Sequence, residues 1–159
     1  LEAKGTPMTY NEMEKLAENA PESLSFINPN DESFAQPGDM IEKIRMAVEK
    51  SGQQSFSDTA SVIRCVYDSL AAEFARTAKD IEKITGRSYE KIYMFGGGTK
   101  DSLICRLTAK ASGKTVIAGP TEATSVGNAL CAFVGSGVIS SVKEARQIVI
   151  KAGMTKEYK

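Results

Sequence analysis

The most regular pattern of apolar positions in the chain runs from about Asp58 to Thr85. Side chains of one stripe recur there at alternating steps of four and three residues, which is the spacing of one helix face. The stripe consists of Ile63, Tyr67, Leu70, Phe74, Thr77, Ile81 and Ile84. It predicts a long helix, ended by Gly86, whose apolar stripe is buried as a main element of the core. A coiled-coil seam has the same spacing, but neighbouring apolar segments favour packing within the chain.

Three shorter helices are predicted from their first residues. Each begins with a capping residue followed three positions later by glutamate, the arrangement of a capping box. The segments are TYNE at 9–12, DMIE at 39–42 and SVKE at 141–144. We expect the three helices to end before Pro21, at Gly52 and at Gly153, because proline cannot continue a helix and glycine favours its left-handed exit.

Strand and helix patterns alternate in the second half of the chain. KIYMF at 91–95 and KTVIA at 114–118 have the composition of short strands. DSLICRLTAKA at 101–111 predicts a helix between them, with its inward positions at Leu103, Ile104 and Leu107. Such a unit has parallel strands, and ligands bind beyond their carboxyl ends. The predicted fold class is therefore α/β and helix-rich, with a short parallel βαβ core.

A further helix is predicted within GPTEATSVGNALCAFVGSG at 119–137. Pro120 closes a turn, and Thr121 is placed to cap a helix that carries Glu122 in its first turn. One face of this helix is smooth because its residues are small: Ala123, Thr124, Ser125, Gly127 and Ala129. Such a face suits close helix packing and suits a ligand lying against it equally well.

Composition narrows the class of protein. A chain of 159 residues is about one domain. Its 20 basic and 20 acidic residues form no long block of one sign, which argues against nucleic acid as a partner. No apolar run is long enough to cross a bilayer, and the first residues lack the pattern of a signal peptide. We therefore expect a cytoplasmic protein with no membrane partner.

Cysteine and histidine content restricts the chemistry. Cys65, Cys105 and Cys131 are widely spaced and odd in number, so they are expected in the core or on helix faces, not in disulfides or a zinc site. The chain has no histidine. This excludes a Ser-His or Cys-His nucleophile, an HExxH zinc site and a histidine general base within these residues. Catalysis would have to use carboxylates, lysines or an imported group.

Gly96, Gly97 and Gly98 lie between the first strand and the following helix. Residues without Cβ allow positive φ and allow another group to touch the main chain. The segment is not a P-loop, because no GxxxxGK[ST] motif occurs, and it is not the GxGxxG dinucleotide motif, because Asp101 occupies the place of the last glycine. A strand, a glycine turn and a helix suit nucleotide binding. Many such turns are glycine-rich for packing alone, so both interpretations remain.

A family resemblance favours the nucleotide. FGGGTKDSLICRLTAKASGKTVIAGPTEATSVGNAL at 95–130 resembles the carboxy-terminal, ATP-binding part of the FGGY carbohydrate kinases. FINPNDESFAQPGDMIEKIR at 26–45 and CVYDSLAAEFA at 65–75 resemble segments of its rhamnulokinase branch, in the same order. The resemblance covers roughly residues 24–153 and leaves residues 1–23 as an amino-terminal helical segment. It implies a single partial domain of the ribonuclease H-like, actin-like ATPase fold.

The resemblance also implies a cofactor site. It places Gly96, Gly97 and Gly98 against the adenosine of ATP, and Thr99, Lys100 and Ser102 at the rim of this site. It makes Gly127 and Ala123 packing residues of a helix at the interdomain hinge. Magnesium would accompany ATP, with contacts mainly from residues outside this chain, and no metal ligand is assigned here.

The implied reaction is transfer of the ATP γ-phosphoryl group to a ketose hydroxyl, with L-rhamnulose giving L-rhamnulose 1-phosphate. In the family the Asp general base and the phosphate loop precede the matching segment, so no catalytic residue is assigned here and the fragment alone is expected to be inactive. The aspartates are candidates by residue type only, and each is equally explained as a cap, turn or solvated residue. They are Asp31, Asp39, Asp58, Asp68, Asp80 and Asp101.

The expected partners are a nucleotide, a sugar and the missing amino-terminal half of the kinase. Apolar surface that once packed on that half favours self-association of the fragment. Two alternatives remain open. One is another FGGY kinase, acting on xylulose, fuculose or glycerol, and the other is a non-catalytic nucleotide- or protein-binding module.

Overall fold

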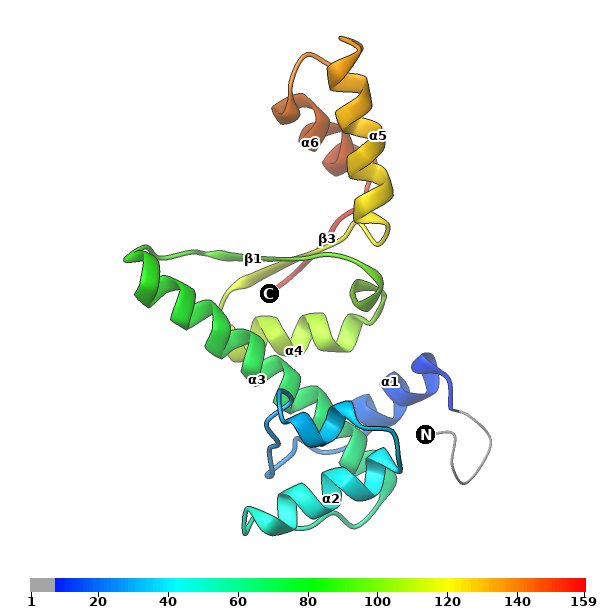
Figure 1. Ribbon diagram of the computed structural model, residues 1–159, viewed down its shortest axis with the longest axis vertical. Helices are drawn as coiled ribbons and strands as arrows, with labels where there is room; N and C mark the ends of the chain where they lie inside the picture. The colour runs from blue at the N-terminus through cyan, green and yellow to red at the C-terminus, as the bar shows by residue number, and fades with distance from the viewer. Residues whose placement is uncertain (1–7) are drawn as a thin grey trace. The chain divides into compact units, whose positions relative to one another are not determined.

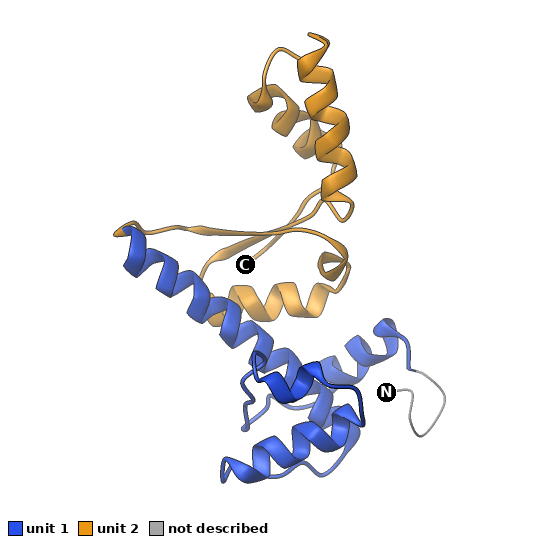
Figure 2. Ribbon diagram, viewed as in Figure 1, with its two compact units in different colours: residues 1–85 blue, residues 86–159 orange. Residues whose placement is uncertain are grey.

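The computed structural model describes residues 8–159 (Figure 1). They belong to two compact units, one ending at Thr85 and the other beginning at Gly86 (Figure 2). The first unit is helical, and the second combines helices with a small sheet. The helix-rich α/β class is therefore confirmed, while the single partial domain stays a prediction.

The first unit is built around its longest helix. Its elements are α1 (Tyr10–Asn19), the 3-10 helix η1 (Glu32–Ala35), α2 (Met40–Lys50) and α3 (Thr59–Thr85). Both α1 and α2 pack against α3, as the matching apolar faces predict. The side chains of Ala17, Val48, Val62 and Cys65 are almost completely buried between these helices.

The predicted helix starts are confirmed, with one complete capping box among them. Thr9 Oγ1 accepts from the Glu12 amide, and the Glu12 carboxylate accepts from the Thr9 amide at 2.7 Å. Asp39 caps α2 by accepting from the Glu42 amide at 3.2 Å. The helix ends lie where proline and the two glycines predict them.

The stripe predicted for α3 is partly wrong about burial. Ile63 is buried, but Phe74, Ile81 and Ile84 are exposed. Beside Ile63 and Val62, the buried residues of α3 are small or polar: Arg64, Cys65, Ser69, Ala71 and Ala75. The reason is that the preceding chain binds this face by hydrogen bonds and close approach, which a count of large apolar residues does not register.

The segment between α1 and η1 is held by such hydrogen bonds. The Ser23 amide donates to Asp68 at 2.8 Å, and the Ile27 amide donates to Ser69 Oγ at 3.0 Å. The carboxamide of Gln53 accepts from the Phe26 amide and donates to the Phe26 carbonyl, at 2.8 and 2.7 Å. An extended segment is thereby fixed without a strand partner.

A three-stranded sheet organises the second unit. Its strands are β1 (Lys91–Met94), β2 (Thr115–Ala118) and β3 (Lys156–Tyr158), in the order β1-β2-β3. The first two are parallel, with Lys91 beside Thr115 and Met94 beside Ala118. The third runs antiparallel to β2. The sheet is therefore mixed, and the parallel core that the sequence predicts is its β1–β2 part.

Helix α4 (Ser102–Ser112) connects β1 to β2 and packs on the sheet (Figure 1). Leu103, Ile104 and Leu107 are buried, as predicted. Asp101 caps the helix by accepting from the amides of Leu103 and Ile104, at 3.0 and 3.1 Å. The predicted βαβ unit is confirmed in both its elements and its inward face.

Helices α5 (Ala123–Gly135) and α6 (Val142–Lys151) pack on each other. The predicted capping role of Thr121 is wrong, because the residue before α5 is Glu122, which makes no side-chain capping bond. No residue of α5 is buried, although the helix is rich in apolar residues. A Cβ placed on Gly127 would meet no atom within 4 Å. The packing role implied for Gly127 thus finds no partner among residues 8–159.

Candidate functional site

The glycine segment follows directly on the carboxyl end of β1. Gly96 has φ +89°, a backbone conformation that residues other than glycine rarely adopt. Residues Gly97–Lys100 then form the 3-10 helix η2, and Asp101 is the capping residue before α4. We call residues 96–100 the glycine loop. It lies where ligands of parallel βα units bind.

Hydrogen bonds fix both ends of the glycine loop. The amide and the hydroxyl of Thr99 both donate to the Gly96 carbonyl, at 3.0 and 2.7 Å. The Asp101 amide donates to the Gly98 carbonyl at 3.2 Å. The Gly96 amide donates to the Pro120 carbonyl at 3.4 Å, which joins the loop to the turn that follows β2.

For two of the three glycines, neither the backbone conformation nor a close neighbour among residues 8–159 requires glycine. Neither Gly97 nor Gly98 has a positive φ, and a Cβ on either would meet no atom within 4 Å. Both residues are exposed. Packing of the turn against its own unit therefore does not explain them. What remains is a bare stretch of main chain open to a group from outside these residues.

The other predicted site residues lie around this bare stretch with different surroundings. Lys100 is exposed, whereas Thr99 is half-buried and turns its hydroxyl to Gly96. Ser102 Oγ accepts from Arg106 Nη1 at 3.1 Å, one helical turn further on. The six predicted residues thus lie together in the loop and the first turn of α4.

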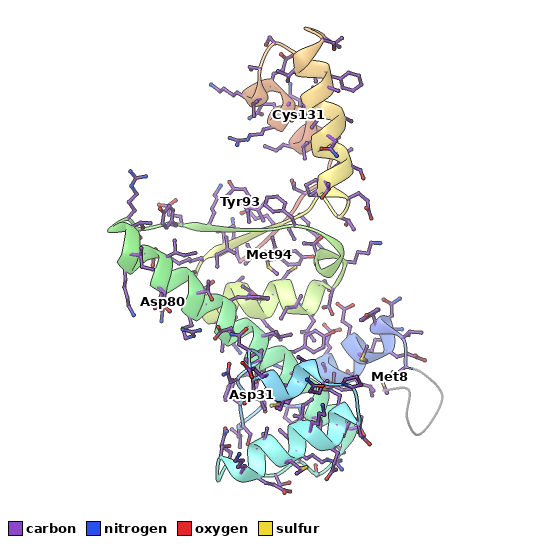
Figure 3. The ribbon with its side chains drawn as sticks, in the orientation of Figure 1. Met8, Asp31, Asp80, Tyr93, Met94 and Cys131 are labelled. Atoms are coloured by element: carbon purple, nitrogen blue, oxygen red, sulfur yellow. The ribbon has the colours of Figure 1, made fainter. Side chains whose placement is uncertain are left out.

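An exposed aromatic pair lies beside the loop and was not singled out from the sequence. The rings of Tyr93 and Phe95 stack with centroids 6.5 Å apart, and each residue is 60% exposed. Figure 3 shows Tyr93 and Met94 on opposite faces of β1, with Met94 on the side of α4. The alternation within KIYMF was a signal for this, since residues 93 and 95 share one face of a strand.

Each of the six aspartates has a structural partner. Asp31, Asp39 and Asp101 cap η1, α2 and α4, and Asp58 accepts from the Ser61 amide at the start of α3. Asp68 pairs with Arg64, and Asp80 pairs with Arg76 and Lys83. Hydrogen bonds from Ser33 lower the pKa of Asp31, and those from Ser61 lower the pKa of Asp58. A lowered pKa makes these two carboxylates weaker bases at neutral pH.

The cysteines lie as predicted, with Cys65 and Cys105 buried and Cys131 exposed on α5. Burial raises the pKa of the Cys65 thiol. Within residues 8–159, histidine, cysteine, aspartate and glutamate side chains nowhere gather in a group of three or more suited to a metal ion. None of the helices described has the length and apolar content needed to span a membrane.

Comparison with known proteins shows the family to which the chain belongs. Residues 2–136 match the carboxy-terminal domain of the FGGY family of carbohydrate kinases. The chain is 31% identical over 150 residues to a rhamnulokinase of Bacteroides thetaiotaomicron, covering 94% of this chain and 31% of that protein. It is 36% identical over 139 residues to a rhamnulokinase of Bacillus subtilis, covering 86% of this chain and 29% of that protein.

A third relative shows the same coverage. The rhamnulokinase of Halalkalibacterium halodurans is 33% identical over 134 residues, which are 84% of this chain and 29% of that protein. The chain therefore spans about 30% of the length of the curated relatives it matches.

Proposed function

Because the chain belongs to the FGGY family of carbohydrate kinases, as part of the carboxy-terminal domain, we propose that its glycine loop binds the adenosine of ATP. The observation that carries this proposal is the bare main chain at Gly97 and Gly98. A flat base or sugar can approach such a surface to van der Waals distance, and a Cβ would prevent it. Gly96, Lys100 and Ser102 form the remainder of the contact surface, next to Thr99.

The capping of α4 supports adenosine, and not phosphate, as the group bound here. A helix amino terminus ordinarily attracts phosphate through its free amides and dipole. At α4 the Asp101 carboxylate already accepts from the Leu103 and Ile104 amides. Its negative charge also repels a phosphate. The uncharged end of the nucleotide is therefore the part that fits beside this loop.

The whole protein would then transfer the γ-phosphoryl group of ATP to a sugar. In this proposal the sugar hydroxyl oxygen attacks the γ-phosphorus, an aspartate takes the hydroxyl proton, and ADP leaves. The aspartate, the phosphate loop and the sugar pocket come from residues outside this chain. Bound Mg²⁺ would neutralise charge on the phosphates. L-Rhamnulose, giving L-rhamnulose 1-phosphate, is the proposed substrate because the similar proteins are rhamnulokinases.

The same proposal gives the uncovered surfaces of the second unit a partner. Helix α5 has no buried residue, and Tyr93 and Phe95 lie exposed on the open face of the sheet. We assign these surfaces to contact with the rest of the kinase, in a ribonuclease H-like fold. Self-association of the isolated piece through them stays a prediction.

The cytoplasm, which holds the ATP pool, is the proposed location.

Nucleotide titration of the full-length protein tests the site. Gly97→Val should weaken ADP binding by roughly tenfold or more, the loss expected when a contact surface is sterically blocked. Ala111→Val is the control, since it adds a branched side chain at an exposed position of α4 outside the glycine loop and outside the surfaces assigned to contact with the rest of the kinase. Unchanged ADP affinity in a folded Gly97→Val protein would contradict the site.

A phosphoryl-transfer assay tests the reaction and its sugar. L-Rhamnulose should be the preferred acceptor in a panel with xylulose, fuculose and glycerol. Preference for another member of the panel would change the proposed sugar substrate and leave the proposed kinase activity unchanged. Binding of ADP without transfer to any sugar would favour the non-catalytic binding module.

A further inference from the structure

One carbonyl group of the glycine loop accepts two hydrogen bonds from a single residue. The Thr99 amide and hydroxyl lie 3.0 and 2.7 Å from the Gly96 carbonyl oxygen. The resemblance to the kinases places Thr99 at the rim of the site, as a residue that faces the ligand. In the structure its hydroxyl hydrogen is instead directed back into the loop.

The loop has few other restraints. Its 3-10 helix is four residues long, and such helices have poorer hydrogen-bond geometry than α-helices. Consecutive glycines lose more backbone freedom on ordering than other residues do. Among residues 8–159, no atom lies within 4 Å of a Cβ placed on Gly97 or Gly98. The order of this stretch therefore rests on the hydrogen bonds at its two ends.

Among these bonds the one from the Thr99 hydroxyl is the shortest. The bond between the Gly96 amide and Pro120 is 3.4 Å long, and that between the Asp101 amide and Gly98 is 3.2 Å long. The hydroxyl bond connects Thr99 to Gly96, as the amide bond of the first turn of η2 does, so this turn is held by two hydrogen bonds. Loss of the hydroxyl would leave the turn with its amide bond alone.

We propose that Thr99 is a positioning residue for the nucleotide, whose hydroxyl holds the glycine loop in its binding shape. This inference rests on the proposed function of the loop. A loop that is ordered before binding does not have to be ordered by the ligand, so affinity is gained without a direct contact. The Thr99 hydroxyl donates its one hydrogen to Gly96 and therefore donates none to the nucleotide.

Substitution at position 99 of the full-length protein tests the inference. Thr99→Val keeps the size of the side chain and removes the hydroxyl, and Thr99→Ser keeps the hydroxyl. Thr99→Val should weaken ADP binding roughly fivefold, the size of one ordinary hydrogen bond, while Thr99→Ser should remain within about twofold of the parent. The KM for the sugar should not change. Equal losses in both variants, or no loss in Thr99→Val, would overturn the inference.

A second nucleotide separates positioning from direct contact. If Thr99 only shapes the loop, Thr99→Val should weaken ADP and inosine diphosphate by the same factor. If its oxygen accepts from the adenine amino group, the loss should be confined to ADP, since inosine lacks that group. Such a selective loss would overturn the positioning role.

Hydrogen exchange reads the shape of the loop without reference to affinity. In the nucleotide-free protein, the hydrogen-bonded amides of Gly96, Thr99 and Asp101 should exchange faster in Thr99→Val than in Thr99→Ser, and saturating ADP should remove the difference. Identical exchange in the two variants would overturn the inference. Gly97→Val distinguishes this failure from that of the proposed function. Loss of ADP binding there, with none in Thr99→Val, rejects only the role of Thr99.

Discussion

The guanidinium of Arg64 lies 2.9 Å from the carboxylate of Asp68, one turn further along α3, and the two side chains are only 8% and 12% exposed. Arg64 also donates to the carbonyls of Ala17 and Ala20 at the end of α1, both at 3.2 Å. Asp68 accepts in addition from the Ser23 amide. This buried cluster joins the end of α1 and the segment after it to α3.

Removal of one member of the cluster should destabilise the first unit strongly. Arg64→Ala leaves the buried Asp68 carboxylate without its cation and two carbonyls without their Arg64 donor, a change that costs about 3–5 kcal/mol of unfolding free energy. Arg76→Ala is the control on the same helix, because Arg76, which pairs with Glu73 and Asp80, has a side chain that is 63% exposed. It should cost about 0–1 kcal/mol. Urea unfolding of both variants at neutral pH measures the difference, and equal losses would contradict it.

Gly119 should tolerate no side chain. Its φ is +103°, and a Cβ there would clash with the backbone carbonyl oxygen of Met154. Gly119→Ala should therefore cost more than roughly 3 kcal/mol of unfolding free energy. Gly113→Ala meets open space at φ +65° and should cost only about 1–2 kcal/mol for the left-handed conformation. Thermal unfolding of the two variants compares them; a similar melting temperature would refute the close contact.

The three cysteines should differ in reactivity. In the native 159-residue chain a soluble thiol reagent should modify Cys131 rapidly, and Cys65 and Cys105 slower by roughly an order of magnitude or more. Burial and the raised pKa of Cys65 both act against its thiolate. Cys131→Ser should abolish the rapid phase. In the full-length protein, contact of α5 with the remaining chain should also slow the rapid phase, and its persistence would argue against the proposed cover of α5.

The start of α6 should contribute a pH-dependent part of the stability. The hydroxyl and amide of Ser140 donate to the Glu144 carboxylate and lower its pKa. Because this pKa is lower in the folded state than in the unfolded state, the stabilisation is complete above the unfolded value of about 4.3. It is lost as the pH falls through the lowered folded value.

Glu144→Gln should accordingly show a smaller drop in unfolding free energy than the parent when the pH falls from about 7 to about 3. Denaturant unfolding at the two pH values provides the measurement. In a Ser140→Ala background, which removes the hydroxyl bond and keeps the amide bond, the Glu144→Gln change should have a smaller further effect on this drop. An equally large further effect would assign the pH dependence to another partner.

Local signals predicted most of the fold because they describe interactions between residues close in sequence. The capping residue Asp101 and the inward positions Leu103 and Leu107 are all decided within α4. The βαβ unit follows from two such strands and one such helix. The glycine loop could be located for the same reason, since a strand, three glycines and a helix are adjacent in the sequence.

The errors have their physical cause in distant partners. The segment KEY at 156–158 is short and charged, and it is a strand because it pairs with the edge of β2. Arg64 is buried because the carbonyls of Ala17 and Ala20 approach it from another helix. None of these choices is visible in local spacing.

The two hydrogen bonds from Thr99 to Gly96 could not be predicted from the sequence either. A threonine after three glycines is compatible with a side chain that faces a ligand and with one that faces the turn. The 3-10 turn through Gly97 and Gly98 brings the Gly96 carbonyl within reach of the Thr99 hydroxyl. The backbone conformation of the two glycines thus decides the role of the threonine that follows them.

Helices α5 and α6 lie in the chain segment that connects β2 to β3, and these two strands are neighbours in the sheet. We call this segment the helical excursion. The β1–α4–β2 unit closes short loops, whereas β3 can be added only after the whole helical excursion has returned, so we expect it to form late in folding. Amides of β3 should then lose hydrogen-exchange protection before those of β1. The excursion also has its two ends close together, at Gly119 and Met154. It is therefore a replaceable module, which a short peptide bridge could substitute while the sheet keeps its strand order.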